Sequence, residues 1–550
     1  WEEALGFVAQ RLEEIKDKYG PQSIGAVISS RLANEEYFLF KKLFKEAIGT
    51  EQISLNGGRG DQGLAEGLSM TLGFASSTNS IKEIRDADCI LIIGVDPAQT
   101  HPIIKNEVHL AIRKNKAQLI VLGNTDIGLS RNTHASPLSP PSISLLTKPG
   151  RELSLLNGMI SVILREGLEE KGFVGEKTEG IDELRKRQDE YSEYLNLFSE
   201  ERKVQVKAEV EKAARSFAQA KNAMILIGPG YWSYSESEEI AIASSNLALL
   251  TGHIGKEGSG IILLLGKCNS QGAIDTGILS GAGGIKDLLK KAEDGSLKAL
   301  YLVGKNPALS SRVLENLKLL VVQDLFMTET AKGAHVVLPA CSFVEKSGTY
   351  TNLERRVQKL HPLRLPEGQS KSDFEIFLRL LRLLEVPVSG ETLEAIFQEF
   401  SQIVPQYQGL QDGEQWPKGA GYLYEDGFPM GKAKLIPLAQ PQPKPQPDPY
   451  PFYLIQRSSL FRSGELSLRS ENLKRVLEKP SLELNIDDAQ SLKIDEGEMV
   501  ELSSPVGKRL KMKVHLSSLL DRGVIAVPSS SALIEEGRAG FVQIKRLKEN

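Results

Sequence analysis

Cysteine and histidine are scarce in this sequence of 550 residues, which holds 3 cysteines and 7 histidines. Cys89, Cys268 and Cys341 lie too far apart to form a C-x-x-C pair, and an iron–sulfur cluster normally takes four cysteine thiolates. No two histidines have the spacing of metal ligands. We therefore expect no iron–sulfur cluster and no disulfide framework within this sequence, and the isolated thiols are typical of cytoplasmic proteins.

Long hydrophobic runs are also missing. The longest apolar stretches, such as residues 89–95 and 260–266, fall far short of the roughly 20 residues that a transmembrane helix needs. The sequence has no surplus of positive charge either, because 67 lysines and arginines face 71 aspartates and glutamates for a net charge of −4. These absences argue against direct membrane insertion and against binding of nucleic acid.

The sequence does contain a repeated alternation of short apolar runs with amphipathic segments. Because a single hydrophobic core stops growing near ~250 to 300 residues, a chain of this length predicts several domains. Apolar, β-branched runs separated by helix-period segments predict parallel sheets with helices on both faces. The expected strands are residues 24–29, 89–95, 118–122, 223–228, 299–304, 319–323 and 335–338.

Prolines occupy every second position of residues 441–451. Proline removes a backbone donor and clashes with helical neighbours, so residues 440–451 predict an extended linker. The part of the sequence after this linker consists of short expected strands interrupted by turns, which favours a small β-barrel.

The sequence therefore predicts an α/β fold with two doubly wound parallel-sheet domains, a helical insertion and a C-terminal β-barrel. The expected segments are an α/β domain in residues 1–150, a helical insertion in 151–222, a second α/β domain in 223–385, a connector in 386–439, the linker in 440–451 and the barrel in 452–550.

A dense, ordered set of residues lies between positions 300 and 358. Its members are Gln323, Asp324, Thr328, Glu329, Thr330, Leu338, Pro339, Gly348, Thr349, Asn352, Glu354 and Arg355. This set resembles the third domain of molybdopterin oxidoreductases, the family that includes formate dehydrogenases, nitrate reductases and the large subunit of complex I. Residues 92–104, 147–160 and 269–277 resemble other parts of the family, and the last hundred residues resemble the C-terminal barrel, of double-psi type, that covers its pterin cofactor.

Two glycines each end an expected strand, at the edge where a doubly wound sheet has its ligand crevice. Asp96 lies two residues after Gly94, and Asn306 lies two residues after Gly304. These polar residues either accept hydrogen bonds from a nucleotide or simply make the turn before a helix. Residues 348–358 either press on a phosphate or pterin or form a surface loop held by ion pairs. The resemblance implies these candidate cofactor-binding residues: Gly94, Asp96, Gly304, Asn306, Gln323, Asp324, Thr328, Glu329, Gly348, Thr349 and Asn352.

The resemblance also locates the position of the metal ligand. Metal-bearing members of the family carry a cysteine, selenocysteine, serine or aspartate there, in a segment that runs here from the Gly-Thr pair at 49–50 to the Gly-Leu pair at 67–68. The ligand position falls on Gly60 and a catalytic histidine position on Asp61. Glycine has no side chain with which to hold a metal. A one-residue shift makes Asp61 an alternative ligand, although the glycine-rich residues 56–63 predict a flexible turn in which Asp61 is solvated or caps the backbone.

The missing metal ligand and the missing cysteines together favour one branch of the family, the large peripheral subunit of a bacterial NADH:quinone oxidoreductase (complex I). The expected function is then a non-catalytic scaffold without a cofactor of its own, located in the cytoplasm and peripheral to the inner membrane through partner subunits. The resemblance implies 2Fe-2S and 4Fe-4S clusters upstream of Trp1 and respiratory partners that include an NADH-oxidising flavin subunit. Two alternatives stay open: an active molybdenum- or tungsten-pterin oxidoreductase such as formate dehydrogenase, with molybdopterin guanine dinucleotide, and a module that binds this cofactor without turnover.

Overall fold

The computed structural model describes residues 1–56, 59–129, 141–278, 284–418, 421–442, 446–461, 464–476, 480–528 and 540–547. It forms two compact units, each made from separate stretches of the chain. Unit 1 contains Trp1–Gln62 and Leu265–Ala420, and unit 2 contains Gly63–Leu264 and Gly421–Asn550. Two prolines of the predicted linker, Pro443 and Pro445, lie outside the described residues.

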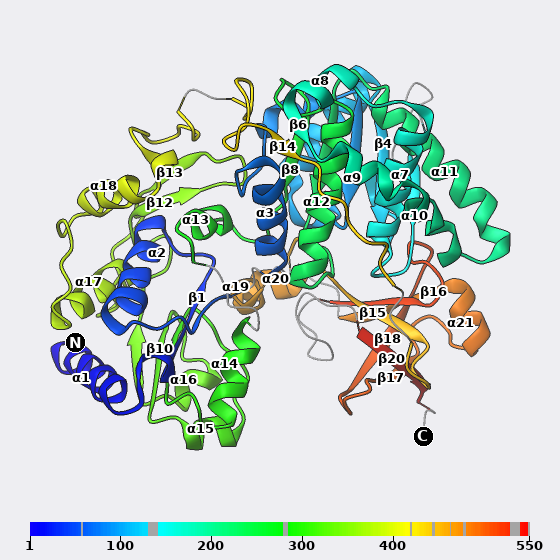
Figure 1. The fold of residues 1–550 in the computed structure, drawn as a ribbon. Coiled ribbons are helices and arrows are strands. Elements are labelled where there is room, and N and C mark those ends of the chain that lie inside the picture. Colours follow the sequence, from blue (N-terminus) through cyan, green and yellow to red (C-terminus); the bar gives the residue numbers. More distant parts are fainter. Residues whose placement is uncertain are drawn as a thin grey trace. The chain divides into compact units, whose positions relative to one another are not determined.

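Unit 1 is built on a five-stranded parallel sheet in the order β11-β10-β9-β1-β2 (Figure 1). All residues of β1, β9 and β10 are buried, as expected for strands that have helices on both faces. The strands are β1 (Ile24–Ser29), β2 (Ile53–Asn56), β9 (Ala299–Val303), β10 (Leu319–Asp324) and β11 (Val336–Pro339). After β11 the chain forms a separate antiparallel hairpin of β12 (Gly348–Thr351) and β13 (Val357–Leu360).

The helices of unit 1 surround this sheet. They are α1 (Glu2–Tyr19), η1 (Pro21–Ser23), α2 (Asn34–Lys41), the π-helical η2 (Lys42–Ile48), α13 (Ser270–Asp275), α14 (Gly284–Glu293), α15 (Ser311–Asn316), α16 (Glu329–Lys332), α17 (Asp373–Leu383), α18 (Leu393–Ile403) and η6 (Pro405–Tyr407). The core on one face of the sheet joins buried Val27, Leu302 and Leu320 to Leu288 of α14. Helix α3 (Arg59–Leu72) begins in unit 1 and ends in unit 2.

Unit 2 contains a second parallel sheet, in the order β5-β4-β3-β7-β8. Its strands are β3 (Cys89–Ile93), β4 (Gln118–Gly123), β5 (Ile143–Leu146), β7 (Ala223–Ile227) and β8 (Gly260–Leu263), and β6 (Thr178–Glu179) pairs separately with β14 (Ala433–Lys434). Its helices are η3 (Ile81–Asp86), α4 (Pro97–Thr100), α5 (Pro102–Asn115), α7 (Glu152–Glu166), α8 (Lys171–Lys177), α9 (Ile181–Lys186), α10 (Gln188–Ser192), η5 (Glu193–Leu197), α11 (Glu200–Ala218) and α12 (Tyr234–Leu250).

The C-terminal part of unit 2 is a closed six-stranded barrel in the order β15-β19-β16-β18-β17-β20. Leu482 and Leu484 of β16 point to its core while their neighbours stay partly exposed, the period of two that a barrel strand requires. The elements are β15 (Phe452–Arg457), α19 (Glu465–Arg469), α20 (Glu471–Val476), β16 (Ser481–Asn485), α21 (Ile486–Leu492), β17 (Met499–Ser503), β18 (Arg509–Ser517), β19 (Val524–Pro528) and β20 (Gly540–Arg546).

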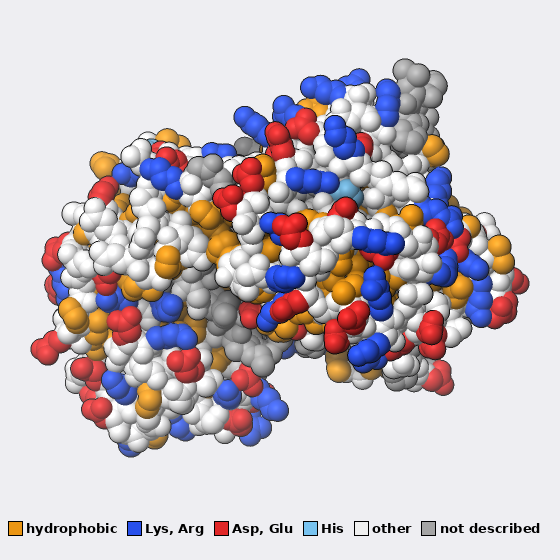
Figure 2. Space-filling view, turned by 45° about the horizontal axis from the view of Figure 1, so that its top comes forward, with side chains coloured by type: hydrophobic (Ala, Val, Ile, Leu, Met, Phe, Trp, Pro, Cys, Tyr) orange, Lys and Arg blue, Asp and Glu red, His pale blue; other side chains and the backbone are white. Residues whose placement is uncertain are grey.

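The predicted fold class is confirmed, because both parallel sheets and the barrel are present. Basic and acidic side chains are interspersed over the face drawn in Figure 2, in keeping with the nearly balanced composition. Of the helices that the structure describes, none combines the length and the apolarity required to cross a bilayer.

Candidate cofactor site

Each parallel sheet has one point at which its strand order reverses. In unit 1 the chain runs outward from β1 to β2 on one side and from β9 to β10 and β11 on the other. In unit 2 the same reversal lies between β3 and β7. A crevice forms past the carboxyl ends of the two strands at such a point, and this is where open α/β sheets bind their ligands.

The crevice of unit 1 lies past β1 and β9. Gly304 follows β9 with a φ of +61°, and a Cβ atom added to it would lie 3.1 Å from the Cβ of Ser29, the last residue of β1. The two backbones therefore approach closely, with Ser30 and Lys305 next in the sequence. The Asn306 side chain bonds within unit 1, because its Oδ1 accepts hydrogen bonds from the backbone nitrogen (3.1 Å) and the hydroxyl (2.8 Å) of Thr330.

Three candidate residues at the end of β10 and the start of α16 also have local partners. The Asp324 carboxylate accepts a hydrogen bond from Phe326 N at 3.1 Å, and Thr328 caps α16 through Ala331 N at 3.1 Å. Glu329 pairs with Lys332 at the surface.

Gln323 is fully buried in the interior of unit 1. It accepts a hydrogen bond from the Tyr301 hydroxyl at 2.7 Å and donates one to Asp373 Oδ1 at 2.6 Å. It therefore connects the sheet to α17.

The segment at 348–358 is a hairpin with a buried tip. The Asn352 side chain accepts hydrogen bonds from Glu354 N (3.0 Å) and Arg356 N (2.9 Å) and so shapes the turn. Arg355 is buried and donates to the Trp416 carbonyl at 3.0 Å. The strand residues Gly348 and Thr349 face α2, where Thr349 donates to Glu35.

Gly60 and Asp61, the predicted positions of a metal ligand and a catalytic histidine, lie in the first turn of α3. Gly60 is partly buried, and Asp61 is only 2% exposed. The Asp61 carboxylate accepts hydrogen bonds from Gly266 N (2.9 and 3.0 Å) and from the Ser270 hydroxyl (2.8 Å). Burial raises the pKa of this carboxyl group, and the same hydrogen bonds oppose the rise.

The flexible turn predicted for this segment is therefore corrected to a helical turn in which Asp61 is buried, because tertiary bonds to Gly266 and Ser270 fix it. Two other glycines of the predicted turn, Gly57 and Gly58, lie outside the described residues.

A tryptophan fills the crevice of unit 2. Gly94 has a φ of +67°, and a Cβ atom added to it would lie 2.3 Å from Cη2 of Trp232, which is 4% exposed. Asp96 caps α4 by accepting a hydrogen bond from Ala98 N at 2.9 Å, and burial raises the pKa of its carboxyl group. The sequence analysis missed Trp232, although the Gly-Pro-Gly-Tyr-Trp run at 228–232, directly after β7, was a signal.

The residues that follow β1 and β9 are of kinds that can bind phosphate oxygens. They are the backbone at Gly304, the hydroxyl-bearing Ser29 and Ser30, and the basic Lys305. For the metal, the described residues contain no group of three or more histidine, cysteine, aspartate or glutamate side chains placed so that they could hold a metal ion.

Comparisons with known proteins cover almost the whole chain. Residues 1–383 match the family "Molybdopterin oxidoreductase", and residues 452–541 match the "Molydopterin dinucleotide binding domain". A formate dehydrogenase subunit alpha of Methanocaldococcus jannaschii is 32% identical over 96% of this chain and 84% of its own length. Formate dehydrogenase H of Escherichia coli is 30% identical over 96% of this chain and 80% of its own length. The structure of acetylene hydratase from Pelobacter acetylenicus has the same fold, with a TM-score of 0.74 at 21% identity over 96% of this chain and 82% of that one.

These findings correct the prediction of function. The two relatives that align with 96% of this chain at 32% and 30% identity are formate dehydrogenases, so the predictions of a complex I subunit, of a non-catalytic scaffold and of no cofactor within the chain are wrong. The physical reason is that the prediction depended on one missing side chain at position 60, whereas the matches to the family and to its dinucleotide-binding domain extend over residues 1–383 and 452–541.

Proposed function

Because the chain belongs to the molybdopterin oxidoreductase family, we propose that it is the pterin-binding subunit of a molybdenum or tungsten oxidoreductase of the formate dehydrogenase type. The observation that carries the proposal is the alignment of 96% of the chain with formate dehydrogenases at 32% and 30% identity. The names of these relatives, one of them a subunit alpha, are our reason for proposing formate as the substrate and further subunits as partners.

The residues of the chain would bind and orient the cofactor. In unit 1, the backbone at Gly304, the hydroxyls of Ser29 and Ser30 and the ammonium of Lys305 would hold a phosphate of a pterin dinucleotide. When bound, the metal supplies two-electron redox chemistry. Asp61 ties the first turn of α3 to the loop at Gly266, which keeps the segment around Gly60 in a fixed place.

Cofactor analysis of the complete enzyme tests this proposal. The chain should be purified without oxygen together with its natural partner subunits, and molybdenum, tungsten and released pterin should be measured per chain. We expect close to one metal per chain, accompanied by pterin, and formate-dependent reduction of a viologen dye. Preparations that hold neither metal nor pterin would overturn the proposal, and a metal-pterin enzyme that is inactive on formate would overturn the proposed substrate.

A pair of glycine variants tests the crevice of unit 1. Gly304→Val places a side chain against Ser29, whereas Gly295→Val has a similar positive φ of +80° but no neighbour within 3.7 Å. Both variants carry the strain of a left-handed residue, on the order of 1–2 kcal/mol. We expect pterin content to fall at least tenfold in Gly304→Val and to stay near the native value in Gly295→Val. Equal pterin contents in two folded variants would show that the crevice does not bind the cofactor.

A further inference from the structure

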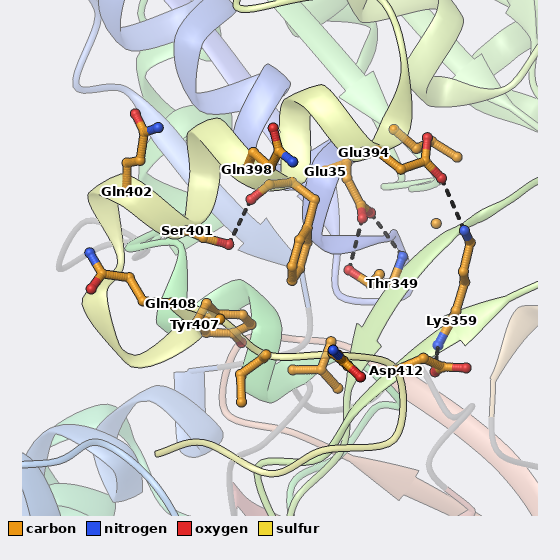
Figure 3. Close-up of a pocket in the computed structure, with 17 residues that line it drawn as sticks. Glu35, Thr349, Lys359, Glu394, Gln398, Ser401, Gln402, Tyr407, Gln408 and Asp412 are labelled. Atoms are coloured by element: carbon orange, nitrogen blue, oxygen red, sulfur yellow. Dashed lines mark hydrogen bonds and ion pairs between the residues drawn. The ribbon is translucent and has the colours of Figure 1, made fainter. Parts of the chain in front are cut away.

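A pocket of about 740 Å³ lies within unit 1, apart from the crevice past β1 and β9 (Figure 3). One wall is a face of α18 that carries Leu393, Phe397 and Ser401, residues spaced at helical intervals. The β12–β13 hairpin forms a second wall and the segment 407–412 a third. Figure 3 shows Glu35 of α2 between α18 and Thr349 of the hairpin.

Glu35 is a buried carboxyl group without a countercharge. Its side chain is 1% exposed, and its oxygens accept hydrogen bonds from Thr349 N (2.8 Å) and the Thr349 hydroxyl (2.9 Å). Among the residues that the structure describes, no lysine, arginine or histidine lies within ion-pair distance of it. Burial raises the pKa of Glu35 to about 7, although the bonds from Thr349 lower it.

Glu36, the next residue of α2, has the countercharge that Glu35 lacks. Glu36 is as deeply buried, but its carboxylate lies 2.7 Å from the ammonium of Lys346. A buried charge without a partner is costly, and folded proteins normally supply one. For Glu35 the chain supplies only neutral donors, which are the backbone and hydroxyl of Thr349 and its own backbone N–H. Because a carboxylate has about four acceptor positions, one remains for a further donor. The pocket is the space from which that donor would come.

The other residues that line the pocket favour a ligand that is apolar apart from its charged head group. Val357, Leu393, Phe397 and Leu410 give apolar contacts. The Tyr407 hydroxyl is bonded to Asp275 and to the Thr351 hydroxyl, and Tyr407 forms part of the third wall. An aromatic wall next to a carboxylate attracts a cation with an apolar body, through charge pairing and cation–π contact.

We propose that this pocket binds a small organic cation, with an ammonium or amidinium head on the Glu35 carboxylate and an apolar or aromatic body against Phe397. This binding is separate from the proposed redox activity and does not require the pterin cofactor.

Other titratable groups line the pocket or act on Glu35 and enter the design of the test. They are Glu36 on α2, Lys359 on β13, Glu394 on α18, and Tyr407 and Asp412 in the third wall. Lys359 and Glu394 pair with each other at 3.0 Å. Burial also raises the pKa of Asp275, behind Tyr407, to about 7. A change in binding near pH 7 must therefore be assigned to Glu35 by substitution.

Three matched probes test the charge preference on the complete protein. They are tryptamine, the neutral alcohol tryptophol and the anion indole-3-acetate, which share one indole ring and differ mainly in the head group. Calorimetric titration at pH 8 should give an affinity for tryptamine at least tenfold above that for tryptophol, with no measurable binding of indole-3-acetate. Equal affinities for tryptamine and tryptophol, or tighter binding of the anion, would overturn the proposal.

The affinity should also depend on pH as Glu35 ionises. An alkylammonium stays protonated well above pH 8, so the cation needs only the ionised carboxylate. Because the pKa of Glu35 is about 7, the affinity for tryptamine should rise about tenfold from pH 6 to pH 8 and then level off.

Two variants complete the test. Glu35→Gln keeps the acceptor for Thr349 but removes the charge, and it should lose at least tenfold in tryptamine affinity and show no pH dependence. Glu315→Gln removes an exposed carboxylate on α15 outside the pocket and should bind as the native protein does. If Glu35→Gln folds and still binds tryptamine with native affinity, the proposal is wrong. If it does not fold, the comparison of the three probes on the native protein still decides.

Discussion

A single lysine holds two buried carboxylates together in unit 1. Lys346 Nζ lies 2.7 Å from both Glu36 Oε2 and Asp373 Oδ2, and all three side chains are at most 6% exposed. Burial disfavours the ammonium, but Asp373 and Glu36 outweigh that effect and raise the pKa of Lys346. Gln323 joins the same group through Asp373. This cluster connects α2 and α17 to the sheet.

Removing the positive charge from this cluster should be costly. Lys346→Met leaves two buried carboxylates without a partner, and breaking such a buried pair costs about 3–5 kcal/mol. We expect a loss of that size in the free energy of unfolding of unit 1, measured by urea denaturation. The triple variant Glu36→Gln, Lys346→Met, Asp373→Asn should regain most of the loss. A loss well below about 3 kcal/mol in the single variant would show that the ion pairs are not formed.

At the scale of elements, α3 and α12 pack through glycine. A Cβ atom added to Gly63 would lie 2.3 Å from the carbonyl oxygen of Tyr234, and one added to Gly67 would lie 2.5 Å from that of Glu238. No side chain fits at either position, so the two backbones touch directly. Glycine lowers the intrinsic stability of a helix, and here the close packing of α3 offsets that loss.

Two alanine substitutions distinguish packing from helix propensity. Gly67→Ala inserts a methyl group into a filled contact and should destabilise the protein by about 1–3 kcal/mol. Gly6→Ala lies inside α1, in its second turn, with no neighbour within 4 Å, and it should stabilise the protein by about 0.5–1 kcal/mol. Thermal unfolding of both variants gives the comparison. A stabilising Gly67→Ala would mean that α3 does not pack closely on α12.

At the scale of the whole molecule, the two units have separate cores although the chain passes between them three times, at 62–63, 264–265 and 420–421. Leu302 belongs to the core beside the sheet of unit 1, and Leu482 to the core of the barrel in unit 2. Separate cores are the usual basis of separate unfolding transitions.

Calorimetry of two core variants tests this separation. Leu302→Ala and Leu482→Ala each remove a fully buried side chain, which costs about 2–5 kcal/mol. We expect two transitions in the native protein. Leu302→Ala should lower the midpoint temperature of one transition, and Leu482→Ala should lower that of the other. A single transition whose midpoint temperature falls equally in both variants would show that the units unfold together.

The sequence alone determined the barrel, the turns that end β3 and β9, and most strands of the two parallel sheets, because these depend on local patterns. It did not predict β2, β5 or β8. A run such as residues 89–93 is apolar at every position since both of its faces are covered, and Gly94 and Gly304 mark positions of positive φ. The missing side chain at position 60 was also plain from the sequence, but its consequence was not.

The tertiary structure alone decided which distant segments meet. β1 pairs with β9, so that Ile24 lies beside Ala299, and no local pattern specifies that pairing. The same holds for Trp232 in the crevice of unit 2, for Asp61 bonded to Gly266, and for Glu35 at a pocket wall without a countercharge. The physical reason is that burial of a strand is favourable in any sheet with covered faces, whereas the choice of neighbours depends on how side chains far apart in the sequence fill space together.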